Sequence, residues 1–216
     1  MGSGITAQAA DNSQSQKEQP KAKEPESDSQ GNILIPFPTE GIFLDELDAL
    51  ILRCGGLPAL EGLSTEEFCE KYVKPLTAHH KISFVDSLKQ EKSRNATVYI
   101  SHSWKSSFSK LIQILKDYFR DSNDVVIWVD IFSVNQHIVR ARTIDNDWWK
   151  RAFQPAIKKI NQLLLVLNPW RDALPLRSTW CVNLPYFLQL LPSHFTLFSI
   201  SNLVVRQVHP GTVLCY

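Results

Sequence analysis

The chain has 216 residues, a formal net charge of +1 and 44% hydrophobic residues. This length suits one globular domain with flanking segments, and the near-neutral charge argues against a nucleic-acid partner. The four cysteines, Cys54, Cys69, Cys181 and Cys215, are widely spaced and fit no disulfide or metal-binding pattern. We therefore expect reduced thiols in a cytoplasmic protein, with no metal site.

Glycine is absent from residues 63–210, which contain the whole candidate core. A P-loop or a Rossmann phosphate-binding turn needs glycine where the backbone approaches phosphate. The sequence therefore excludes both nucleotide-binding motifs in their standard forms.

Residues 1–32 are rich in Ser, Gln, Lys, Glu and Pro, a composition that predicts a disordered tail. The first six residues, "MGSGIT", match the N-myristoylation pattern with Gly2 as the acceptor, although so short a pattern also arises by chance. One acyl chain binds membranes weakly, and the tail has no polybasic segment to assist it. Membrane contact through acylated Gly2 is therefore a secondary hypothesis.

Residues 33–93 are predicted to form a helical lead-in segment. Residues 41–53, "GIFLDELDALILR", carry apolar side chains at helical spacing and end before Gly55 and Gly56. Ser64 and Glu67 have the spacing of a capping box, which predicts a second helix that continues to Pro75.

Residues 94–181 alternate between apolar strands and amphipathic helices. Strands are predicted at 97–101, 125–130 and 163–167, with one helix capped by Ser106 or Ser107 and another over 146–160. Uninterrupted apolar strands that alternate with helices are typical of a parallel sheet covered on both faces. The predicted fold class is therefore α/β.

Polar and aromatic residues follow each predicted strand. They are Ser101, His102, Ser103 and Trp104 after the first, Asp130, Asn135 and Gln136 after the second, and Trp170 and Arg171 after the third. Ligands of open α/β sheets bind at the carboxyl ends of the strands, so these loops could form a cleft for a ligand or partner. The alternative is that each residue only caps a helix or satisfies loop backbone.

Four stretches, "VYISHSW", "IWVDIFSVNQH", "LLLVLNPW" and "RSTWC", occur in this order. Together they resemble the TIR-like (Toll/interleukin-1 receptor-like) domain of the protist and invertebrate type, and they are also similar to the fungal heterokaryon-incompatibility domain. The stretch "STEEFCEKYVKPLT" resembles the helix that often precedes the protist-type domain, so the match spans roughly residues 64–181. The resemblance implies a flavodoxin-like sheet with helices on both faces.

In such families the domain is either a self-associating signalling adaptor or an enzyme that cleaves the nicotinamide–ribose bond of NAD. The resemblance adds Trp180 and Cys181 to the cleft candidates, and it places the catalytic glutamate four residues after that tryptophan. Leu184 stands there instead and offers no charge to stabilise a developing cation. We therefore expect a non-catalytic domain that binds itself or similar domains, with a degenerate NAD-binding or NAD-cleaving enzyme as the alternative.

Residues 182–216 form a divergent apolar C-terminal segment that lacks the helix expected from the resemblance. Three interpretations remain: a divergent last layer of the core, an interfacial membrane anchor, or an alternative ending of the chain. We favour the alternative ending. It predicts that the sheet lacks its final strand and leaves an unpaired edge.

Overall fold

The computed structural model describes residues 26–27, 33–34, 37–88, 93–122, 124–139, 157, 159–160, 162–166, 197–201 and 204–208. The chain divides into two units, Met1–Ile35 and Pro36–Tyr216. In the first unit, β1 (Glu26–Ser27) pairs antiparallel with β2 (Ile33–Leu34). Two residues of the tail predicted to be disordered thus form a strand, and the rest of 1–32 lies outside the described residues.

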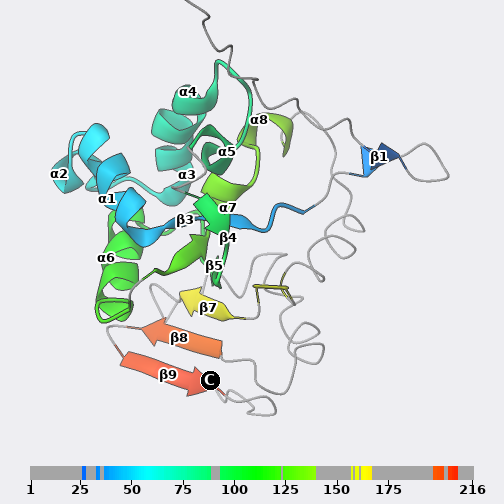
Figure 1. The fold of residues 1–216 in the computed structure, drawn as a ribbon. Helices are drawn as coiled ribbons and strands as arrows, with labels where there is room; N and C mark the ends of the chain where they lie inside the picture. The colour runs from blue at the N-terminus through cyan, green and yellow to red at the C-terminus, as the bar shows by residue number, and fades with distance from the viewer. Residues whose placement is uncertain are drawn as a thin grey trace, which may run out of the picture. The chain divides into compact units, whose positions relative to one another are not determined.

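The second unit is built on a mixed sheet whose described strands follow the order β4-β3-β6-β5-β7-β8-β9 (Figure 1). These strands are β3 (Glu40–Phe43), β4 (Ser93–Asn95), β5 (Val98–Ser101), β6 (Val126–Trp128), β7 (Leu163–Val166), β8 (Leu197–Ser201) and β9 (Val204–Val208). The four strands from β6 to β8 in this order are parallel, and the strands outside them are antiparallel. The α/β fold class is therefore confirmed.

The three central strands lie where the apolar runs predicted them. In β5, Val98 and Ile100 join the main hydrophobic core, and Tyr99 between them is also buried, stacked on the Trp128 ring at a centroid distance of 4.6 Å. Because successive side chains of a strand point to opposite faces, both faces of the sheet are covered at these strands.

The lead-in segment contributes a strand that the sequence analysis did not predict. The helix predicted over residues 41–53 begins only at Leu44, because the three residues before it belong to β3, which lies between β4 and β6. A Cβ atom on Gly41 would lie 2.2 Å from the carbonyl oxygen of Ile127. Glycine at this position therefore lets β3 approach β6 closely enough to pair.

The described helices are short apart from α1 and α6. They are α1 (Leu44–Arg53), α2 (Leu57–Leu60), α3 (Thr65–Phe68), η1 (Cys69–Val73), α4 (Lys74–Thr77), α5 (Phe84–Ser87), α6 (Phe108–Tyr118), α7 (Asp130–Ser133) and α8 (Gln136–Val139). The predicted capping box is confirmed, since Ser64 and Glu67 bond reciprocally at the start of α3. Ser107 caps α6, as one of the two predicted candidates.

Pro75 does not end the second lead-in helix, contrary to the prediction. The preceding turn, η1, is π-helical, and the Lys74 amide donates to the Cys69 carbonyl five residues earlier. A π-helical turn widens the helix locally, and helices accommodate interruptions of their regular hydrogen-bond pattern, such as a proline, in this way. The chain therefore continues as α4 through Pro75 to Thr77.

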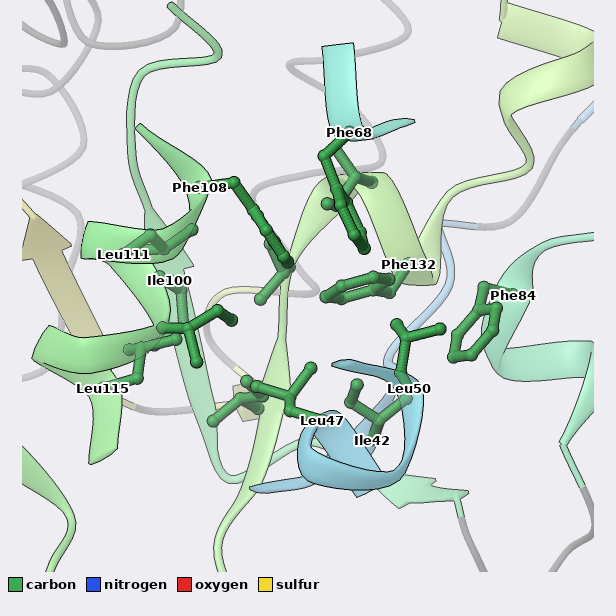
Figure 2. Close-up of a cluster of buried hydrophobic side chains, with 14 of the residues drawn as sticks. Ile42, Leu47, Leu50, Phe68, Phe84, Ile100, Phe108, Leu111, Leu115 and Phe132 are labelled. Carbon is green, nitrogen blue, oxygen red and sulfur yellow. The ribbon is translucent and has the colours of Figure 1, made fainter. Parts of the chain in front are cut away.

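Three phenylalanines join the lead-in segment to the helices that follow β5 and β6 (Figure 2). Phe68 of α3 stacks on Phe108 of α6 with ring centroids 3.7 Å apart, and Phe132 of α7 packs edge-on against both at 6.4 Å. All three side chains are at most 1% exposed. The lead-in helices are therefore part of the main hydrophobic core.

The sheet continues beyond β7 into the divergent C-terminal segment. Four residue pairs join β7 to the parallel strand β8, and β9 then pairs antiparallel with β8 (Figure 1). The prediction of an unpaired edge at β7 is therefore wrong. The sequence contained the signal, because "TLFSISNLVVRQV" places two apolar runs around Ser201 and Asn202, which are common turn residues.

We predict that Gly41→Ala lowers the free energy of unfolding by about 3 kcal/mol or more, because the new methyl group collides with β6 backbone. Denaturant unfolding measures this change. Gly62→Ala is the control: its φ of 78° is strained for alanine but nothing lies within 4 Å, so a loss of about 1 kcal/mol is expected. Equal losses in the two variants would contradict the close approach.

Candidate functional site at the ends of β5 and β6

The carboxyl ends of β5 and β6 meet at one edge of the sheet because the two strands are parallel neighbours. The Trp104 indole, in the loop after β5, donates from Nε1 to Oδ2 of Asp130 at the start of α7, at 2.5 Å. The structure thus brings together candidates from the first two strand ends. This hydrogen bond ties the loop after β5 to the helix after β6.

The Asp130 carboxylate is engaged on both oxygens. Oδ2 accepts the Trp104 indole, and Oδ1 accepts the backbone N–H of Ile131 at 2.8 Å. The Asp130 carbonyl accepts from Nε2 of Gln136, also at 2.8 Å. In this conformation Asp130 connects the two loops. This is a structural role, and it differs from the ligand-binding role that the sequence analysis considered for this residue.

His102 has a buried nitrogen with no hydrogen-bond partner among the described residues. Its side chain keeps some exposed surface, but Nε2 itself is enclosed. Burial lowers the pKa of the imidazole below its ordinary value of 6.5, and the nearby Asp130 carboxylate opposes that shift. The ring is therefore neutral at pH 7, and its enclosed nitrogen is an unused polar group.

The other described candidates mainly satisfy loop backbone. Asn135 donates to the Lys81 carbonyl at 2.6 Å and accepts the His137 amide at 3.0 Å. Gln136 is buried and also donates to the Val134 carbonyl at 3.0 Å. Ser103 accepts the amide N–H of Lys105 at 3.3 Å, and Ser101 is the half-buried last residue of β5.

The lead-in segment holds the loop after β5 in place. The backbone N–H groups of Thr65 and Glu66, in the first turn of α3, donate to the carbonyls of Ser106 and Trp104, both at 2.9 Å. Phe108 donates back to the Leu63 carbonyl at 2.9 Å. The amides at the start of α3 have no acceptor within the helix, and they therefore donate to carbonyls of the loop that carries the candidate site.

The loop after β6 is held by the same segment. The Thr77 hydroxyl lies 2.8 Å from Nε2 of His137, and the Lys81 carbonyl accepts from Asn135. Sequence reasoning missed Thr77 and His137, because no motif links two residues 60 positions apart. The resemblance of the lead-in helix to a family helix is the signal that pointed to this region.

Several candidates cannot be placed. Trp170, Arg171, Trp180 and Cys181 lie outside the described residues, as do Gly2, Leu184 and all but three residues of the predicted helix over 146–160. Within the described part of the chain, no cluster of three potential metal ligands occurs and no helix has the length and apolarity needed to cross a membrane. Cys54 and Cys69, which are described, are buried thiols.

A hollow of about 510 Å³ lies before the amino end of β6, between the start of α1 and the end of α6. The strand-end candidates lie at the carboxyl ends of the strands. The lining of the hollow consists of Phe43, Leu44, Asp45, Asp48, Lys116, Phe119, Arg120, Ser122, Asp124 and Val125. The hollow therefore shares no residue with the strand-end candidates.

Comparison with protein-family models, curated proteins and solved structures finds no match to this chain.

A double-mutant cycle tests the connection between Trp104 and Asp130. Trp104→Phe leaves a partly buried carboxylate oxygen without its donor, so we expect a loss of about 2 kcal/mol in unfolding free energy. Asp130→Ala removes the acceptor of the same bond, and the double variant should lose clearly less than the sum of the two. Additive losses would show that the two side chains do not interact.

Acid should destabilise the protein through His102. Because its pKa is lowered on folding, the unfolded chain binds a proton first, and the free energy of unfolding falls as pH drops below about 6.5. His102→Gln should reduce this slope by up to about 1.4 kcal/mol per pH unit in unfolding titrations. Equal slopes in wild type and His102→Gln would contradict the assignment.

Proposed function

We propose that this chain is a non-catalytic TIR-like signalling domain that acts by self-association or by docking to similar domains. The observation that carries this proposal is the state of Asp130. Both oxygens of this carboxylate hold protein groups, the Trp104 indole and the Ile131 amide. Leu184 occupies the family glutamate position, so the main family source of catalytic charge is also missing.

The order of the parallel strands supports the flavodoxin-like part of this proposal. Numbered along the chain from β5, the parallel strands follow the spatial order 2-1-3-4. Flavodoxin-like sheets have the order 2-1-3-4-5, with the switch point between their first and third strands. The corresponding neighbours here are β5 and β7. Ser101 ends β5 at that point, and His102 follows it.

Nucleotide binding is the second candidate function, and the enclosed Nε2 of His102 favours it. A neutral imidazole beside the switch point could donate one hydrogen bond to a nucleotide such as NAD, or accept one from it, after the groups that enclose Nε2 move aside. In this reading, the ligand would have to replace the Trp104 bond to reach the Asp130 carboxylate. Ser101, Asn135 and Gln136 would then only shape the surrounding loops.

We predict that the full chain forms concentration-dependent oligomers without ligand in sedimentation velocity. Nicotinamide release from NAD should equal that of a heat-inactivated sample. Saturable NAD binding that disappears in both Asp130→Ala and Trp104→Ala, from a chain that stays monomeric, would instead establish the second candidate. Because both variants weaken the connection between the loops, their folding is checked by circular dichroism.

A further inference from the structure

The outer face of α1 carries an exposed apolar side chain among charged ones. Leu52 is 78% exposed, the highest value among the large hydrophobic side chains that the structure describes. Asp45, Asp48 and Ala49 are also exposed and share its face, because residues three, four and seven positions apart align on a helix. Arg53 is exposed beside Leu52 in the last turn.

The hollow described above lies at the other end of the same helix. Phe43, Leu44, Phe119 and Val125 give it apolar walls, and Asp45, Asp124 and Arg120 add charged groups to its rim. Asp48, nearer the middle of the helix, forms an ion pair with Lys116 of α6. One end of α1 thus presents a protruding leucine and a cation, and the other end presents a recess of net negative charge.

We propose that a second copy of this chain docks on this face, with the two α1 helices antiparallel about a two-fold axis near Asp48. Leu44 and Leu52 are eight positions apart, which is about 12 Å along a helix. A two-fold axis midway between them places each Leu52 at the partner's hollow. A contact in which one patch meets its own copy in this way is isologous and closes as a dimer.

The charges fit this arrangement. Arg53 comes beside the partner's hollow. The lining there holds three carboxylates (Asp45, Asp48 and Asp124) and two cations (Lys116 and Arg120), so each half of the contact joins a cation to a surface of net negative charge. Asp48 lies closest to the axis, where two like charges would repel, but its ion pair with Lys116 offsets that charge. Ala49, a small residue at the crossing, lets the helix backbones approach. This inference rests on the proposed self-association and names the surface responsible.

Sedimentation equilibrium of the full chain tests the surface. Leu52→Asp should raise the dimer dissociation constant at least about 30-fold, the effect of losing a central contact residue. Leu76→Asp is the matched control, since Leu76 is a 40% exposed leucine on α4, outside α1 and the hollow. It should leave the dissociation constant unchanged.

Charge reversal tests the antiparallel register. Arg53→Glu should weaken the dimer, and the double variant Asp45→Arg/Arg53→Glu should restore it, because the opposite charges meet again. A wild-type dimer that is indifferent to Leu52→Asp would overturn this surface and leave self-association standing. A wild-type chain that stays monomeric at every concentration would overturn both this surface and the self-association part of the proposed function.

Discussion

The Asp130 carboxylate stands where β6 ends and α7 begins, and it connects the two strand-end loops. One oxygen accepts an amide of its own helix, and the other accepts the Trp104 indole from the loop after β5. A half-buried carboxylate is costly without donors, so the geometry of both loops depends on these two hydrogen bonds. An acid used in this way holds the edge of the sheet together, and a ligand must displace the indole to reach it.

The lead-in helices also hold the two strand-end loops in place. The first turn of α3 donates two backbone hydrogen bonds to the loop that carries Trp104, while Thr77 and Lys81 contact the loop after β6. The stacked rings of Phe68 and Phe108 secure the same helix in the core. The lead-in segment and the strand-end loops therefore form one structural unit, although they are far apart in sequence.

Local sequence signals predicted much of this fold, but they did not predict the pairing of strands that are far apart in the sequence. The Ser64 capping box, the Ser107 cap and the three central strands depend on nearby residues, and each was found from sequence. Strand β3 was missed because its partner lies far along the chain, as in the pair Ile42 and Ile127. At the site, sequence located polar side chains at two strand ends, but it could not reveal that they bond chiefly to each other and to the lead-in.

Hydrogen exchange of the Trp104 indole N–H, measured by NMR with and without NAD, tests the central claim most directly. The account predicts slow exchange at a rate set by unfolding, because Asp130 and the surrounding loops protect the bond. It also predicts that NAD leaves this rate unchanged. Rapid exchange without ligand would show that this bond opens readily, and protection that appears only when NAD is added would show that the strand ends form an open nucleotide site. Either result would contradict the account.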